Sequence, residues 1–121
     1  MAPEQTTNSP QSKTYEDYYR EGWSIHGSKK NEDVAEENFR QAIALDPNSV
    51  DAYYGLGLVL KAQDRRQDAI LAFQKVIDLL AASSSEDRIR IQMLRRLSIG
   101  HINQMKTGDW NLEKEIWKRL K

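Results

Sequence analysis

The chain has no cysteine, and only three prolines and two phenylalanines among its 121 residues. The missing cysteine excludes disulfides, thiolate-bound zinc and a thiol nucleophile. It is compatible with a reducing compartment, and we expect a cytoplasmic location. Long apolar runs are also missing, since none approaches the roughly 20 residues of a transmembrane helix. The start of the chain lacks the order of a secretory signal. We therefore expect no membrane insertion.

The chain has no excess of charge of either sign, because 18 basic residues balance 18 acidic ones. The balance conceals an asymmetry. Residues 1–60 hold 5 Lys and Arg against 10 Asp and Glu, whereas residues 61–121 hold 13 against 8. Such a polarity could orient a partner or a second copy of the chain, although solvated helix faces would show the same charges. A neutral chain without a nucleic-acid motif predicts no nucleic-acid partner.

A short pattern occurs twice, with a spacing of 34 residues. The repeated pairs are Ala35 and Ala69, Phe39 and Phe73, Ala42 and Val76, Ile43 and Ile77, and Pro47 and Ala81. Upstream the spacing is 35, for Tyr18 and Tyr53, Gly22 and Gly57, and Ile25 and Leu60. The change of spacing predicts one extra residue in the turn of the first copy. A period in this range is typical of stacked helical hairpins.

Local signals divide the chain into a polar leader that we expect to be disordered, residues 1–13, and a domain of six helices, residues 14–121. Thr14 and Asn31 are predicted to cap the first two helices, and Pro47 stops the second. Asn48 is predicted to open the third helix. The fourth should run past Ala81, where the second copy lacks the proline.

A serine among residues 83–85 is predicted to cap a long fifth helix at about 86–106. Gly108 should end that helix, and a sixth should follow from Asp109. The expected repeats are 15–47, 48–82 and 86–121. About ten extra residues separate the aromatic position of the second copy from that of the third, at Trp117. No alternation typical of a strand occurs, so the predicted fold class is all-α.

These residues resemble tetratricopeptide repeats. The second copy has the aromatic, Leu–Gly and apolar positions of the family's first helix, followed by the alanine and aromatic of its second helix. They are Tyr53, Leu56, Gly57, Leu60, Ala69 and Phe73. The first copy departs from the motif at Glu21, where leucine is usual. The resemblance implies three hairpins in a short right-handed α-solenoid, and a scaffold or adaptor that binds other proteins.

The resemblance also implies a binding groove lined by the first helix of each hairpin. Carried over residue by residue, the groove positions are Tyr19, Trp23, Tyr54 and Leu58, with His26 and Lys61 one turn further along. A cluster of aromatic residues is typical of a protein-binding hot spot. The alternative is that the leader or the third hairpin covers these side chains. Some relatives grip a terminal carboxylate with polar groove residues. Tyr19, Trp23 and Leu58 replace such residues here and argue against that activity.

Two other groups of residues have a functional and a structural interpretation. Arg88, Arg90, Arg95 and Arg96 could form a patch for an acidic partner or a solvated helix face. The last helix carries Trp110, Trp117 and several basic residues, which suit a membrane surface but also a helix that caps the stack.

Residues able to perform chemistry are sparse. His101 and Met105 lie one turn apart and could ligate a haem iron, but no attachment cysteine accompanies them. The acidic run Glu32 to Glu37 could attract a cation, or compensate a helix dipole. We therefore expect no enzyme, no cofactor and no metal site. The sequence favours an adaptor that binds a peptide or helix of another protein, with a self-associating structural protein as the main alternative and a cofactor carrier as a remote one.

Overall fold

The structure, a computed structural model, describes residues 13–29, 31–83 and 87–110. These residues form five helices and no strand. The helices are α2 (Tyr15–Ser28), α3 (Glu32–Leu45), α4 (Val50–Ala62), α5 (Arg66–Ala81) and α6 (Arg88–Thr107). The expected leader, except for Lys13, and all but the first residues of the expected sixth helix lie outside the described residues.

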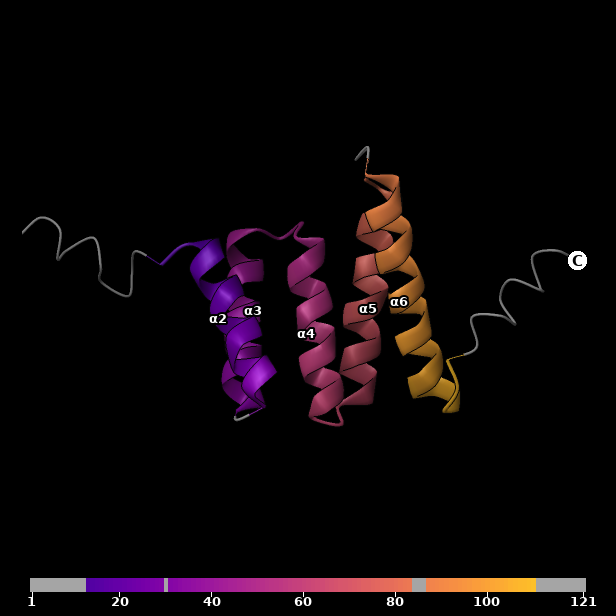
Figure 1. Ribbon diagram of the computed structural model, residues 1–121, viewed down its shortest axis with the longest axis horizontal. Helices are drawn as coiled ribbons and strands as arrows, with labels where there is room; N and C mark the ends of the chain where they lie inside the picture. The colour runs from indigo at the N-terminus through magenta and orange to yellow at the C-terminus, as the bar shows by residue number, and fades with distance from the viewer. Residues whose placement is uncertain (1–12, 30, 84–86, 111–121) are drawn as a thin grey trace, which may run out of the picture.

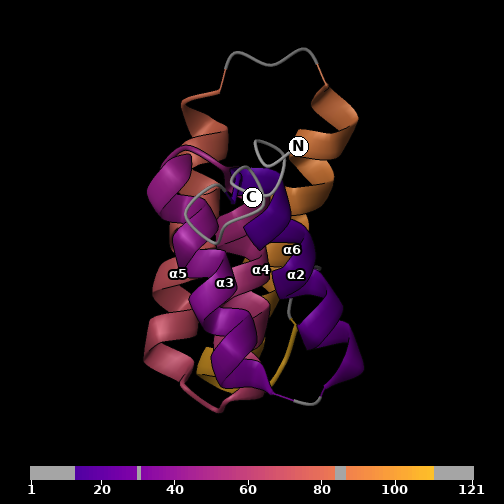
Figure 2. The ribbon, with the colours of Figure 1, turned by 90° about the vertical axis from the view of Figure 1, so that its left-hand side faces the viewer.

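Consecutive helices pack against each other along the whole chain, from α2 on α3 to α5 on α6. Figure 1 shows α2 and α3 at one end of the molecule, α4 in the centre and α6 at the other end. Seen from the first end, α2 and α6 lie on one side, and α3 and α5 on the other (Figure 2). The helices are thus stacked hairpins in a short α-solenoid, as the sequence predicted.

Two phenylalanines join the hairpins. Phe39 and Phe73 are completely buried, as the repeat pattern predicted. Phe39 occupies the space left by two glycines, since a Cβ atom on Gly22 of α2 would lie 3.0 Å from its ring, and one on Gly55 of α4 only 2.5 Å. Gly57 makes room for Phe73 in the same way, at 2.8 Å. Glycine therefore sets the closest approach of helix to helix.

The predicted caps are confirmed for the first hairpin. Thr14 and Asp17 form a reciprocal capping box at the start of α2, and the Asn31 side chain accepts from the backbone N–H of Val34. α3 ends at Leu45, just before Asp46 and Pro47. Gly108 ends α6 in the left-handed conformation, with φ of 81°.

Other boundaries differ from the prediction. Ser49, not Asn48, caps α4, because its hydroxyl accepts from the backbone N–H of Ala52 and also bonds the Tyr15 hydroxyl at 2.6 Å. Asp87, not a serine, caps α6. α5 ends at Ala81 and so does not run a further turn.

The extra residue of the first copy also lies elsewhere than predicted. Both hairpins have three residues between their helices, 29–31 and 63–65. α2 has 14 residues and α4 has 13. By these bounds the extra residue belongs to the helix.

Candidate functional site: the first-helix face

The candidate site is the side of the molecule formed by α2, α4 and α6. We call it the first-helix face, and define it by the six residues that the sequence predicted for a groove. These are Tyr19, Trp23 and His26 on α2, and Tyr54, Leu58 and Lys61 on α4. All six are half-buried, so each side chain packs on the protein and keeps part of its surface accessible.

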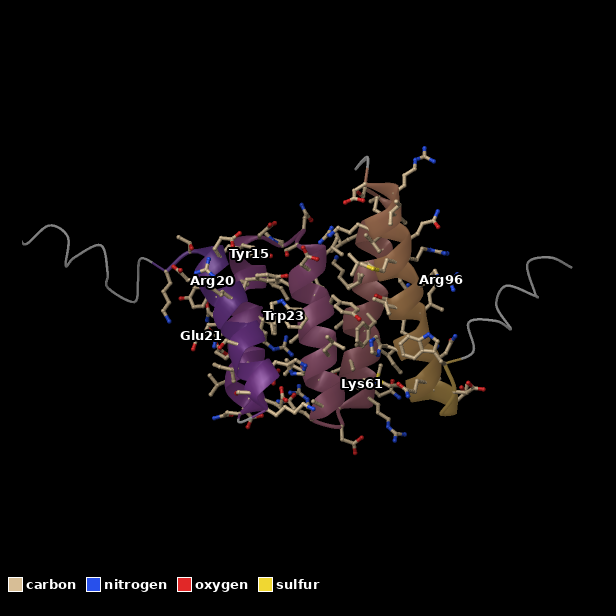
Figure 3. The ribbon with its side chains drawn as sticks, viewed as in Figure 1. Tyr15, Arg20, Glu21, Trp23, Lys61 and Arg96 are labelled. Atoms are coloured by element: carbon tan, nitrogen blue, oxygen red, sulfur yellow. The ribbon has the colours of Figure 1, made fainter. Side chains whose placement is uncertain are left out.

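A ladder of aromatic rings runs along α2. Tyr19 meets Trp23 edge to face, with ring centroids 6.2 Å apart, and Trp23 meets Phe39 at 5.3 Å. Figure 3 shows Trp23 between α2 and α4. The buried Phe39 contacts the rings of Tyr19 and Trp23, and these contacts fix the orientation of both rings.

Tyr15 extends the ladder by one turn and was missed by the sequence analysis. Its ring stacks on Tyr19 with centroids 5.5 Å apart. Its hydroxyl reaches Ser49 at the start of α4. The spacing of four residues between Tyr15 and Tyr19 was the available signal, since side chains four apart on a helix are neighbours.

His26 contacts the second helix of its own hairpin. Its Nδ1 atom lies 2.9 Å from Glu32 Oε1 at the start of α3. The histidine therefore joins the two helices of its own hairpin. Only the part of its side chain that stays exposed belongs to the first-helix face.

The second half of the face is shared with α6. Lys61 Nζ donates to His101 Nδ1 at 3.0 Å and to Gln104 Oε1 at 2.5 Å. Since Nδ1 must accept from an ammonium group, the proton of the neutral imidazole lies on Nε2, which faces the Tyr54 hydroxyl at 3.2 Å. The His101 ring also stacks on Phe73, with centroids 4.7 Å apart.

Burial controls the ionisation of this cluster. It lowers the pKa of His101 to about 4, with a further contribution from the nearby Lys61 ammonium. It lowers the pKa of Lys61 and raises that of Tyr54. Desolvation disfavours the charged form in each case, so the imidazole is neutral at pH 7.

Tyr19 lies near a charged pair that spans two helices. Asp51 of α4 and Arg90 of α6 form an ion pair. The pKa of Tyr19 is raised by burial and then by the Asp51 carboxylate. The face thus has an ion pair at the Tyr19 end, a lysine without a carboxylate partner among the described residues at the other, and apolar rings between them.

The predicted arginine patch is divided by the structure. Arg90 is tied to Asp51. Arg88, Arg95 and Arg96 form no ion pair with any described carboxylate. Of the four arginines, Arg90 alone has a carboxylate partner among the described residues.

The side chains considered as ligands of a haem iron or of a cation make other contacts. His101 uses both ring nitrogens in contacts with Lys61 and Tyr54, and Met105 is 9% exposed in the core. In the acidic run, Glu32 bonds His26 and Glu36 bonds Arg40 and Arg65. Within the described ranges, no three acidic or histidine side chains gather into a site for a metal ion.

A hollow on the opposite side was not predicted. It has a volume of about 460 Å³ and lies between α3, α4 and α5. Leu56, Leu60 and Ala72 line it together with Leu71, which is 68% exposed. Sequence reasoning missed it because the resemblance directed attention only to first helices.

Comparisons with known proteins agree with this architecture. A family model described as "TPR repeat" matches residues 33–64, and one described as "Tetratricopeptide repeat" matches residues 50–79. The chain is 32% identical over 69 residues to the small glutamine-rich tetratricopeptide repeat-containing protein 2 of Saccharomyces cerevisiae. That alignment covers 57% of this chain and 20% of the yeast protein. No solved structure matches the chain.

The described helices thus form a stack of helical hairpins, and residues 33–79 match models of tetratricopeptide repeats. Such repeats mediate protein–protein interaction, and the matches support that general class of function. In the part of the chain that the structure describes, no helix has the length and apolar character needed to cross a membrane.

Proposed function

We propose that the chain is an adaptor whose first-helix face binds a peptide segment or a helix of another protein. The observation that supports this most is the aromatic ladder on α2, in which Tyr15, Tyr19 and Trp23 are in contact, half-buried and held from below by Phe39. Aromatic rings fixed on a rigid support bind with little loss of side-chain entropy.

The charges of the face indicate the polarity of the ligand. Lys61 presents a cation with no described carboxylate partner, and its pKa is lowered by burial. A ligand carboxylate placed there would relieve the cost of holding that charge partly desolvated. The ligand expected is therefore an apolar segment, with an acidic residue at the Lys61 end.

The experiment is a selection of displayed peptides on the wild-type protein, followed by affinity measurements on variants. Trp23→Ala and Tyr54→Ala should each weaken binding by about 30-fold or more, as removal of a hot-spot residue does. Leu71→Ala is the matched control, because Leu71 lies exposed on α5 and outside the face. Thermal unfolding of each variant verifies its fold. Unchanged affinity in both face variants would refute the proposal.

A further inference from the structure

In the described part of the chain, the first half of α6 has exposed apolar side chains on its outer side. Ile89 is 84% exposed and Met93 is 52% exposed, and they are four positions apart, so they lie on one face of the helix. Arg96 follows one turn later and projects away from α5 at the end of the molecule (Figure 3). Further along, the same side is covered, since the Trp110 ring lies so close to Gly100 that a Cβ atom there would sit 1.9 Å from it.

The first half of α6 is strongly basic, since it carries four arginines and no acidic residue. Arg90 is neutralised by Asp51, which leaves Arg88, Arg95 and Arg96 without a described carboxylate. A helix face that combines exposed apolar side chains with unpaired charge of one sign is typical of an interface.

The opposite end of the molecule has the complementary character. Figures 1 and 2 show that α2 and α3 together form this end. α2 carries three acidic residues and one arginine, and α3 carries four and one. Glu16 and Glu36 pair with arginines and Glu32 contacts His26, which leaves Asp17, Glu21, Asp33 and Glu37 without a described cationic partner. On α3, Val34 is 42% exposed and Leu45 is 55% exposed. Glu21 of α2 projects at this end (Figure 3).

We propose that the protein associates with further copies of itself, head to tail, through these two ends. The α6 end, defined by Ile89, Met93 and Arg96, docks on the first-hairpin end, defined by Glu21, Val34 and Leu45. Because the two surfaces differ, every assembly keeps one free end of each kind, so further copies can add and the contact produces open chains instead of closed dimers.

Charge favours a second copy over another occupant of the α6 end. The nearest candidate in the same chain is residues 111–121, which hold four basic and two acidic residues. That segment has the same sign of charge as α6. The first-hairpin end has the opposite sign, and it is present at the same concentration as α6.

Sedimentation velocity over a range of concentrations, at 20, 150 and 500 mM NaCl, tests the proposal on the full chain. The average mass should rise with protein concentration at low salt and fall as salt screens the charges. A full chain that is monomeric at low salt and high concentration overturns the proposal. So does association that strengthens with salt.

Blocking one end at a time distinguishes head-to-tail contact from any other self-association. Met93→Glu with Arg96→Glu blocks the α6 end, and Glu21→Gln with Val34→Gln blocks the first-hairpin end without reversing its charge. Each double variant should weaken association by at least about tenfold, because the first makes like charges meet and the second removes one acidic and one apolar contact. An equimolar mixture of the two should restore association and stop at a 1:1 dimer, since only one intact pair of ends remains.

The control is Leu71→Glu with Lys75→Glu, which makes the same kind of change on the exposed side of α5 and should associate as the wild type does. A mixture that stays monomeric overturns the proposal. A chain truncated after Trp110 tests the other occupant. If it associates while the full chain does not, residues 111–121 cover α6 and the proposal is wrong.

Discussion

At the scale of the residue, glycines fix how closely the helices pack. Gly55 of α4 leaves room for the Phe39 ring, and a Cβ atom there would lie 2.5 Å from two of its carbon atoms. The repeat pattern identified Gly22 and Gly57 but not Gly55. Gly55 has no counterpart at the corresponding position of the first copy, so only the structure shows which ring it faces.

Gly55→Ala should therefore lower the free energy of unfolding by about 1–3 kcal/mol, as overpacking of a core does. This outweighs the gain in helix propensity of up to about 1 kcal/mol. Gly27→Ala is the matched control, because nothing lies within 4 Å of its Cβ position, and it should keep or raise the stability. Urea unfolding of the two variants measures both. Equal stability of Gly55→Ala and wild type would show that Phe39 can move.

His101 should make the stability of the folded protein depend on pH. Its pKa is about 4 in the folded protein and about 6.5 when unfolded. Between these values the unfolded chain binds more protons, so the free energy of unfolding should fall as pH is lowered from 6.5 to 4, by up to about 1.4 kcal/mol per pH unit. Urea unfolding across this window measures the slope.

Comparison with His101→Gln isolates the contribution of this histidine, because the slope should become shallower in that variant. Lys61→Met should keep most of the slope, since burial lowers the pKa more than the ammonium does. Identical slopes in the wild type and His101→Gln would contradict the assignment. The cluster itself was not predictable, because His101 is 47 residues from Tyr54 and 40 residues from Lys61 in the sequence.

At the scale of the element, local signals located all five described helices but not all of their ends. Thr14 and Asn31 cap their helices as predicted, and neither has another good cap residue directly beside it. Asn48 and Ser49 are both good caps, and local sequence could not rank them. The choice depends on Tyr15, whose hydroxyl bonds Ser49 across 34 residues of sequence.

Ser49→Ala removes the α4 cap and the bond to Tyr15 together, and it should cost about 1–2 kcal/mol of stability. Asn48→Ala is the neighbouring control and should stay within about 0.5 kcal/mol of the wild type. Thermal unfolding of both variants measures the difference. If Asn48→Ala lost more stability than Ser49→Ala, Asn48 and not Ser49 would be the cap of α4.

At the scale of the whole molecule, the repeat spacing predicted the stack, and the resemblance predicted which helices form the candidate face. The pairing of the face residues came only from the structure. His26 joins Glu32 in its own hairpin, whereas Lys61 reaches across to α6. Spacing along one helix defines a face, but it cannot show which neighbour covers that face.

A stack of hairpins is held mainly by contacts between neighbours, so its stability should vary along its length. α4 buries six of its 13 residues between the helices on either side of it, whereas α2 buries only Gly22, and α6 five of 20. Amide hydrogen exchange should therefore be slowest in α4 and the adjoining half of α5, and faster in α2 and in the first turns of α6 around Ile89. Mass spectrometry of peptides from each helix, at 500 mM NaCl to suppress association of the ends, measures this gradient. Uniform protection across all five helices would mean that the stack opens as one cooperative unit. The exposed first half of α6 would then be as stable against local opening as the centre of the stack.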